Sequence, residues 1–296
     1  MGERVRPAAW DRPLPRVLRA IVLDALRLGT GAALPTNAHY LGTVGATAGT
    51  IQRAVAVLAE QEALTTTSHG AGGRQIGSLH VGRAWTLAGL APVRLLLPPS
   101  GPVEFDALVD GITDRLTGLG LPHTVRHLRG GSRRLDAVAG GAADVAVVSS
   151  GVLGAAADRL GEVPIRQLGP GTYYAAGAVV SVVRAADPPT VPARVAIDRD
   201  SPDHTLLTEA AYPPDEGYEY VERPFPEVPA AVLRGDVDAG VWHRSPSVVP
   251  LDLAGLACIP LGSAATEVWA EISAAALVGA PERPELRAVL DAVALV

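Results

Sequence analysis

Apolar residues near the start of the chain recur with the spacing of an amphipathic helix. Leu18, Ile21, Ala25 and Leu28 lie three or four residues apart and predict a first helix over residues 15–28. Glycines follow directly, as they often do where a helix ends. The chain is therefore expected to open with a helix that buries one face.

Two further helices are predicted next, with a tight turn at Gly45 between them. Thr36 follows a proline and is placed to cap a short helix of about six residues. Thr47 is placed to cap a longer helix from Ala48 to about Gln61. The apolar face of this longer helix is formed at positions i, i+3, i+4 and i+7 by Ile51, Ala54, Val55 and Leu58.

The opposite face of the longer helix carries polar groups near its N-terminus, namely Gly49, Thr50, Gln52 and Arg53. Glutamine pairs with adenine and arginine with guanine in the major groove of DNA, and the first amides of a helix suit a phosphate. Two helices joined by a tight turn, with such groups at the start of the second, form the helix-turn-helix arrangement. Simple packing of an amphipathic helix is the alternative explanation of the same face.

Residues 64–79 predict a β-hairpin with a glycine-rich tip, and His69 and Arg74 near that tip are candidate contacts to the sugar-phosphate backbone. The capping residues Thr36 and Thr47 are also candidate DNA contacts. Three short helices followed by this hairpin resemble the GntR-type winged helix-turn-helix, which implies double-stranded DNA as a partner. Ala48 stands where that family often has arginine, which puts one phosphate or base contact in doubt. The residues that match the family pattern are Leu34, Pro35, Thr36, Gly45, Thr47, Gly49, Thr50, Ala54, Leu58, Gly70 and Gly73.

From Val93 onward, short apolar runs alternate with segments of helical spacing. This alternation predicts an α/β fold whose sheet strands are mostly parallel. Two stretches, residues 138–149 and 232–243, align without gaps, and each predicts a helix that ends at glycine, an aspartate and a buried strand. Such junctions are common in α/β proteins, but the repeat favours two similar lobes with a ligand cleft at the carboxyl ends of their strands. The matched pairs are Val138 with Val232, Gly141 with Gly235, Asp144 with Asp238, and Val147 with Val241.

The formal net charge of −6 is unevenly distributed along the chain. Residues 1–90 contain nine Arg and five Asp or Glu, whereas residues 91–296 contain sixteen Arg and twenty-six Asp or Glu. A basic segment joined to an acidic body favours polyanion binding by the first part alone.

Polar groups follow the predicted strands of both lobes, where a ligand would bind. Hydroxyls, amides at helix starts and one arginine suit a small polar or anionic metabolite. Serines also cap helices, and a tryptophan after an apolar strand is often part of a core, so each residue is a candidate only. The candidates are Ser100, Gly101, Arg129, Gly130, Ser132, Ser149 and Ser150 in the first lobe, and Asp198, Ser201, Trp242 and His243 in the second.

The C-terminal part resembles the type 2 periplasmic-binding-protein fold, and the chain from about Pro15 onward resembles the YhfZ family of transcriptional regulators. That resemblance implies a GntR-like DNA-binding domain joined to an effector-binding domain. The family commonly has a Tyr-Ser pair and a further Tyr near the end of the first strand, where this chain has residues 99–102 and Phe105, so that side of the pocket is expected to differ. The matching residues are Ile197, Asp198, Ser201, Asp203, Leu207, Thr208, Gly235, Asp238 and Trp242.

Other classes of function find little support in the sequence. The single cysteine, Cys258, excludes a disulfide framework and a thiolate cluster, and the seven histidines lack zinc-site spacing. Nucleotide-binding loops and nucleophile motifs are missing as well. No signal peptide or long apolar run is evident. We therefore expect no catalytic residue, metal or cofactor, and a cytoplasmic protein that does not bind a membrane.

These patterns together predict a one-component transcriptional regulator. A homodimer, an operator DNA duplex and an unidentified small-molecule effector are its expected partners. The alternative is a two-lobed small-molecule-binding protein or enzyme whose N-terminal helices serve only oligomerisation. The expected domains are a winged helix-turn-helix over residues 1–81, a linker over 82–92 and an effector domain over 93–296, with lobe I about 93–168 plus the C-terminal segment and lobe II about 169–260.

Overall fold

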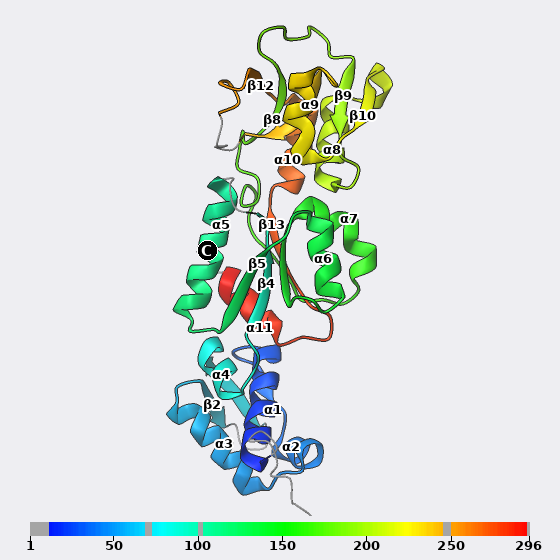
Figure 1. Ribbon diagram of the computed structural model, residues 1–296. Coiled ribbons are helices and arrows are strands. Elements are labelled where there is room, and N and C mark those ends of the chain that lie inside the picture. Colours follow the sequence, from blue (N-terminus) through cyan, green and yellow to red (C-terminus); the bar gives the residue numbers. More distant parts are fainter. Residues whose placement is uncertain (1–11, 69–72, 100–102, 245–249, 295–296) are drawn as a thin grey trace, which may run out of the picture. The chain divides into compact units, whose positions relative to one another are not determined.

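The computed structural model of the protein describes residues 12–68, 73–99, 103–244 and 250–294 (Figure 1). The chain divides into two compact units, which we call the N-terminal unit and the two-lobed unit. The N-terminal unit comprises the described residues within 1–94, 112–124 and 279–296, and the two-lobed unit those within 95–111 and 125–278.

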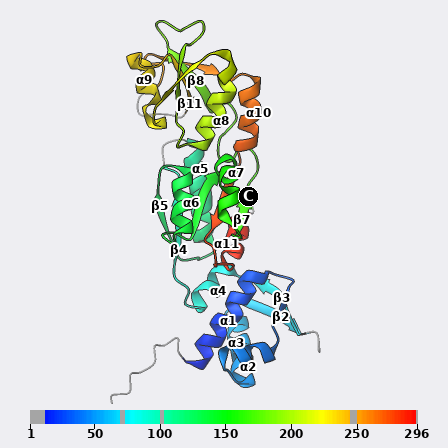
Figure 2. The same cartoon turned by 90° about the vertical axis from the view of Figure 1, so that its right-hand side faces the viewer.

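The N-terminal unit begins with three helices and a three-stranded antiparallel sheet of order β1-β3-β2. All three helices lie where the hydrophobic spacing predicts them, and the hairpin of β2 and β3 lies where the glycine-rich tip predicts it. Figure 2 shows that hairpin beside α3, with which β2 is in contact. The bounds are α1 Pro13–Leu28, β1 Ala33–Leu34, α2 Asn37–Val44, α3 Ala48–Glu60, β2 Leu64–Ser68 and β3 Arg74–Leu79.

The core of this region is formed where α1 packs against α3. Val17, Ile21 and Val22 of α1 and Ile51 and Leu58 of α3 are almost completely buried. Burying a large aliphatic side chain stabilises the fold by about 1.5–3 kcal/mol. The apolar stripe of α3 is therefore used for packing, and its other side is left exposed.

Helices α4 and α11 also belong to the N-terminal unit. Helix α4, Val81–Leu87, lies in the stretch expected to be a linker, and His80 caps it because Nδ1 accepts from the Arg83 amide at 3.3 Å. Trp85 of α4 is buried, and its Nε1 donates to the Ala91 carbonyl at 2.8 Å. Helix α11, Leu286–Ala294, packs against α1 and α4. The C-terminal helix therefore shares a core with the first helix of the chain.

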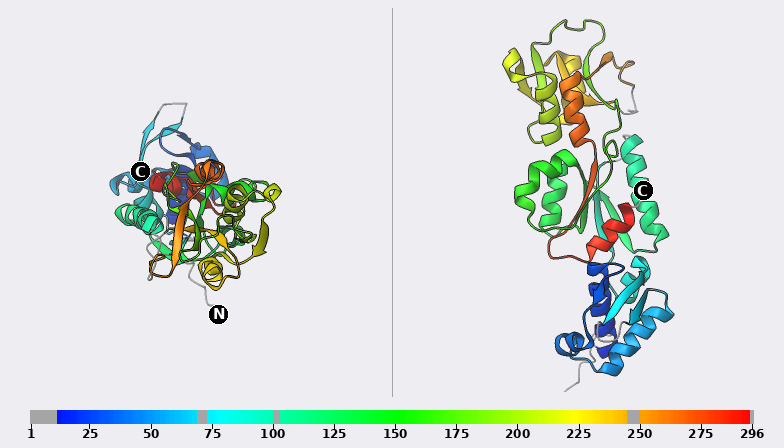
Figure 3. Two further views of the ribbon diagram at one scale, coloured as in Figure 1. Left: turned by 90° about the horizontal axis from the view of Figure 1, so that it is seen from above. Right: turned by 180° about the vertical axis from the view of Figure 1, so that it is seen from behind.

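Lobe I contains a five-stranded sheet of order β5-β4-β6-β13-β7, in which β4 and β6 are parallel and β13 and β7 are antiparallel. Figures 1 and 3 show α6 and α7 covering one face of this sheet. A strand from near the C-terminus, β13, lies beside β6 in the middle of the sheet. The bounds are β4 Val93–Leu97, α5 Val103–Gly118, β5 His123–His127, α6 Gly131–Ala139, β6 Val145–Ser149, α7 Ser150–Leu160, β7 Ile165–Gln167 and β13 Ala275–Gly279.

Lobe II contains a second five-stranded sheet, of order β10-β9-β11-β8-β12. Helices α8 and α10 pack against each other, and α9 packs on β8 and β11. The bounds are β8 Val179–Arg184, β9 Arg194–Ile197, α8 Pro202–Ala211, η3 Pro214–Glu216, β10 Glu219–Glu222, η4 Phe225–Glu227, α9 Val228–Arg234, β11 Ala239–His243, β12 Leu256–Pro260 and α10 Ser263–Ile272.

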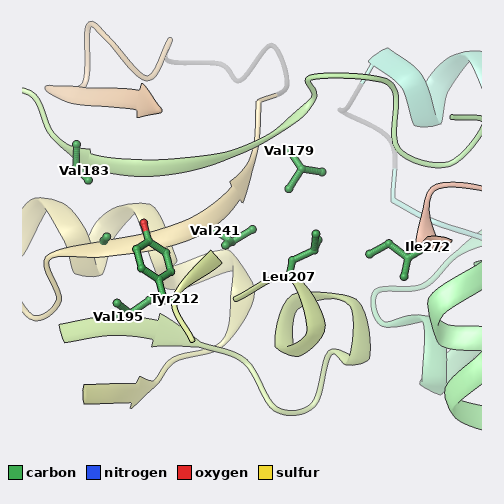
Figure 4. Packing of buried hydrophobic residues seen from close by; sticks show 8 residues of the cluster. Val179, Val183, Val195, Leu207, Tyr212, Val241 and Ile272 are labelled. Carbon is green, nitrogen blue, oxygen red and sulfur yellow. The ribbon is translucent and has the colours of Figure 1, made fainter. Parts of the chain in front are cut away.

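Side chains on the two faces of β8 belong to two different hydrophobic cores of lobe II. Val179 and Val183 belong to a cluster with residues of α8 and α10, whereas Val180 and Val182 belong to a cluster with residues of α9. Successive side chains of a strand point to opposite faces, so one strand serves both clusters. Figure 4 shows the first cluster, in which Val179, Val183, Val195, Leu207, Tyr212, Val241 and Ile272 point toward one another.

The repeat found in the sequence corresponds to a real structural repeat. Gly141 follows α6 and precedes β6, and Gly235 follows α9 and precedes β11. Both adopt positive φ, +74° and +75°, which favours glycine. The mixed α/β class is therefore confirmed, and the two five-stranded sheets each carry one copy of the repeat. Among the described residues, no helix has the length and apolar character needed to span a bilayer.

Two crossing segments connect the lobes, and they are hydrogen-bonded to each other. The amides of Tyr173 and Tyr174 both donate to the Ser273 carbonyl, at 2.8 and 3.2 Å. The Ala275 amide donates to Thr172 Oγ1 at 2.9 Å. The first segment leads from β7 to β8, and the second leads from α10 to β13. The hydrogen bonds between the two segments join residues about a hundred positions apart in the sequence.

Candidate functional site

The first turn of α3 presents the polar residues that the sequence singled out. Thr47 caps the helix, because its Oγ1 accepts from the Thr50 amide at 3.2 Å. Gly49, Gln52 and Arg53 are exposed, while the opposite side of the helix is buried. Within the described residues, the only ion pair of Arg53 is with Glu60 at 3.7 Å, and both side chains are more than half exposed. Such a pair contributes little, so Arg53 can exchange it for another partner.

The remaining DNA-binding candidates lie on α2 and on the hairpin. Thr36 caps α2, where its Oγ1 accepts from the His39 amide at 3.4 Å. Arg74 begins β3 and donates to Asn37 Oδ1 at 3.1 Å. Its side chain is therefore held near the start of α2. His69 lies outside the described residues.

In lobe I, the candidates Arg129, Gly130 and Ser132 lie between β5 and the first turn of α6. Arg129 is exposed in the loop after β5, and Gly130 adopts a φ of +83° as the cap of α6. Ser132 is half-buried in the first turn of that helix. Ser100 and Gly101 lie outside the described residues.

In lobe II, Asp198, Ser201 and Trp242 are engaged in local packing. Asp198 Oδ2 accepts from the Phe225 amide at 2.7 Å, which fixes the start of η4. Trp242 stacks on the Phe225 ring with 4.4 Å between ring centroids, and it packs against the core cluster on the α9 side. Ser201 precedes α8 and makes no side-chain cap bond. Asp198 and Trp242 therefore both contact Phe225, and Ser201 lies two positions before Asp203.

Ser149 lies at the centre of a buried polar cluster within the two-lobed unit. It ends β6 and caps α7, where its Oγ accepts from the Val152 amide at 3.1 Å. The same hydroxyl donates to Asp203 Oδ2 at 2.6 Å, and Tyr174 donates to that oxygen at 2.7 Å. Asp203 comes from the first turn of α8 in lobe II. The cluster therefore joins lobe I, a crossing segment and lobe II.

Arg134 of α6 extends the cluster on the lobe I side. It is only 1% exposed, yet all three hydrogen bonds that it makes among the described residues go to uncharged oxygens. The acceptors are the carbonyls of Val147 and Leu128 and the hydroxyl of Tyr173, at 2.8, 2.6 and 2.8 Å. A buried cation without a hydrogen-bonded acid is costly, and such residues are often found at functional sites.

Asp203 is the most unusual group of the cluster. It is 4% exposed, and its Oδ1 has no hydrogen-bond partner among the described residues. Burial raises the pKa of Asp203, while the hydrogen bonds from Ser149 and Tyr174 and the charge of Arg134 partly oppose that rise. Burial and the charge of Asp203 also raise the pKa of Tyr174 well above its ordinary value. Both effects reflect an acid held away from water.

Two histidines of lobe II lie near these groups. His243 is buried at the end of β11, with its ring 5.9 Å from that of Tyr174. His204 follows Asp203, accepts from the Asp198 amide through Nδ1 at 2.9 Å and bonds the Val241 carbonyl through Nε2 at 3.0 Å. Burial lowers the pKa of His204. His204 therefore acts as a neutral cross-link between α8 and β11.

Among the described effector candidates, Ser149 belongs to this cluster and His243 lies near its Tyr174 ring. Ser150 is adjacent, but its hydroxyl donates to the Glu271 carbonyl at 2.7 Å. Four residues of the buried cluster were not predicted as site residues from the sequence, namely Arg134, Tyr173, Tyr174 and Asp203. Asp203 had been marked only through family resemblance, and the Tyr-Tyr pair after a Gly-Pro-Gly stretch was the other available signal. Within the described residues, no group of three His, Cys, Asp or Glu side chains is arranged to hold a metal ion.

Comparison with known proteins gives a consistent result for the two-lobed unit. The family described as the YhfZ C-terminal domain matches residues 81–295. YhfZ of Escherichia coli (strain K12) is 28% identical over 144 residues, which are 48% of this chain and 46% of that protein, so about half of the relative's length is matched.

The chain is also similar to solved structures. The crystal structure of YhfZ from Shigella flexneri is 24% identical, with 69% of this chain and 90% of that chain covered and a TM-score of 0.45. The alkanesulfonate-binding protein SsuA from Xanthomonas axonopodis pv. citri is 17% identical, with 69% and 72% covered and a TM-score of 0.50. The two lobes therefore have a fold of the periplasmic-binding-protein type.

Proposed function

This chain belongs to the YhfZ C-terminal domain family, and on that premise we propose that it is a transcriptional regulator that binds DNA through α3 and a small molecule through its two lobes. The N-terminal unit supplies the DNA-binding surface, and the two-lobed unit supplies the sensor. The protein works as a cytoplasmic homodimer without catalysis.

The observation that carries this proposal is the first turn of α3. The helix is capped by Thr47, buried along one side and exposed at Gly49, Gln52 and Arg53. The order of α1, β1, α2, α3, β2 and β3, with a sheet of order β1-β3-β2, supports the proposal of a winged helix-turn-helix. In such folds the exposed start of the third helix lies in the major groove, where glutamine and arginine read bases.

The fold of the two lobes supports the sensor role. A periplasmic-binding-protein type of fold places strand ends and helix starts of both lobes around a ligand, and one solved neighbour is an alkanesulfonate-binding protein. The crossing segments with their mutual hydrogen bonds suit a hinge.

A covalent route connects the sensor to the DNA-binding surface. Strand β13 of lobe I continues along the chain into α11, which packs against α1 in the N-terminal unit. Helix α1 in turn packs against α3. A ligand that shifts β13 changes the support of the recognition helix, and by linkage DNA binding then changes ligand affinity equally.

The proposal is tested by selecting DNA from a pool of random duplexes with the purified full chain. We expect an enriched sequence with two half-sites about ten base pairs apart, because each protomer of a dimer brings one recognition helix. Arg53→Ala should weaken binding of that duplex by roughly 10–100-fold and relax its specificity, measured by fluorescence anisotropy. The affinity should fall steeply with salt, because phosphate contacts release counterions.

Arg159→Ala is the matched control, since Arg159 is an exposed arginine on α7 of the two-lobed unit. It should bind the selected duplex as the wild type does. Failure of the wild type to enrich any sequence would contradict the regulator and favour the role of the N-terminal helices in oligomerisation alone.

A further inference from the structure

The first turns of two helices, one from each lobe, lie beside the Asp203 carboxylate. Helix α7 starts directly after Ser149, and Asp203 lies in the first turn of α8. A Cβ on Gly151, in the first turn of α7, would come within 2.2 Å of Asp203 Oδ1. The carboxylate therefore lies against the N-terminal turn of α7. Helix starts carry positive partial charge and are common binding positions for acid groups.

The Asp203 carboxylate lies among hydrogen-bond donors of which it uses only some. Hydroxyls of Ser149 and Tyr174 both donate to Oδ2, and Oδ1, although buried, receives no hydrogen bond among the described residues. Arg134 lies buried in the same cluster with only uncharged acceptors. Buried polar atoms are nearly always hydrogen-bonded, so the unbonded Oδ1 of Asp203 calls for an explanation.

We propose that the position of the Asp203 carboxylate is the binding site for an acid group of the small-molecule ligand, and that Asp203 is the internal competitor for that site. The ligand is then a small molecule with an oxyanion group, such as a carboxylate. Its acid group accepts from Ser149 Oγ and Tyr174 Oη beside the N-terminus of α7, and Asp203 is displaced together with the start of α8. This inference rests on the proposed sensor function and names the ligand class of that same site.

The test is chemical rescue of Asp203→Ala with formate, because this substitution removes a group of the size of formate. At ten times its Kd, formate should raise the Tm of the variant by about 2–5 °C at constant ionic strength. Formamide has the same size but no charge and should have no effect. The exposed acid Asp136 provides the matched control, since formate should leave the Tm of Asp136→Ala unchanged.

If Asp203→Ala does not fold, a second variant still tests the proposal. Asp203→Asn preserves the shape and removes the competing charge, so formate should bind it at least about tenfold more tightly than it binds the wild type, by isothermal titration calorimetry. Adding Ser149→Ala should abolish both effects. Equal responses to formate and formamide in both variants would overturn the proposal and make Asp203 a structural acid.

The DNA-binding regulator and the anion site can be contradicted independently of each other. Formate rescue uses no DNA, so a rescue combined with no selected duplex would keep the anion site and remove the regulator. A selected duplex without formate rescue would keep the regulator and remove the anion site.

Discussion

Asp238 and Asp203 are two aspartates of lobe II whose surroundings differ in kind. Asp238 precedes β11 and is bound by the amides of Ala193 and Arg194, with the guanidinium groups of Arg184 and Arg194 at 3.6 and 3.3 Å. Asp203 is more deeply buried, is bound by two hydroxyls, and leaves one oxygen unused.

The contrast shows how a structural acid differs from one at a candidate site. Burial would raise the pKa of Asp238, but its backbone hydrogen bonds and the charge of Arg194 lower it overall. For Asp203, burial outweighs two hydrogen bonds and raises the pKa. A fully bonded charge stabilises the fold, whereas a partly bonded one is retained at a cost in stability.

The largest effect is expected for Asp238→Ala. The substitution removes two amide hydrogen bonds and leaves Arg184 and Arg194 without their shared acid. The free energy of unfolding should fall by about 2–4 kcal/mol, measured by urea denaturation. Asp136→Asn, at an exposed ion pair, should change it within error. A similar loss for both variants would remove the distinction between the two kinds of acid.

An intermediate effect is expected for Gly151→Ala, because the new Cβ would meet Asp203 Oδ1 at 2.2 Å and Ile272 Cγ2 at 2.8 Å. Overpacking of this kind destabilises by about 1–3 kcal/mol. Gly154→Ala on the same helix has open space around it and should be neutral or slightly stabilising. In a double-mutant cycle, Asp203→Ala should reduce the cost of Gly151→Ala. Strict additivity would mean that the Asp203 carboxylate does not lie against α7.

The smallest effect, but the most specific, is a pair of opposite pH dependences. The pKa of Asp203 is raised in the folded state, so relative to Asp203→Asn the wild type should lose stability as pH rises above about 4. The pKa of Asp238 is lowered, so relative to Asp238→Asn the wild type should lose stability as pH falls below about 4. Denaturation curves at several pH values measure both differences. Slopes of the same sign would contradict the comparison.

Local patterns in the sequence were sufficient to predict the first three helices and the repeat, although α4 was expected to be part of a linker. Helices α1, α2 and α3 follow from hydrophobic spacing and from the caps Thr36 and Thr47. Gly141 and Gly235 indicated two equivalent helix-to-strand junctions. Both adopt a positive φ, which favours glycine. These features depend on neighbours within a few positions along the chain. They could therefore be predicted without knowledge of the tertiary structure.

The candidate site was predicted less well, because its contacts join distant positions. Ser149 and Asp203 are 54 positions apart, and Arg134 and Tyr173 are 39 apart. The sequence placed Ser149 at a strand end, but it also placed Trp242 and Asp198 there, and these pack on Phe225 instead. Which strand-end groups meet depends on how the lobes approach each other.

The sequence by itself determined the order of the elements, the exposed polar start of α3 and the division into repeated α/β lobes, since periodicity and turn residues act locally. Only the tertiary structure decided that Arg134 lies buried among neutral oxygens and that Asp203 lies at the start of α7 with one oxygen unused. The desolvation of a charge and the close approach at Gly151 arise from packing between segments that are far apart in the chain.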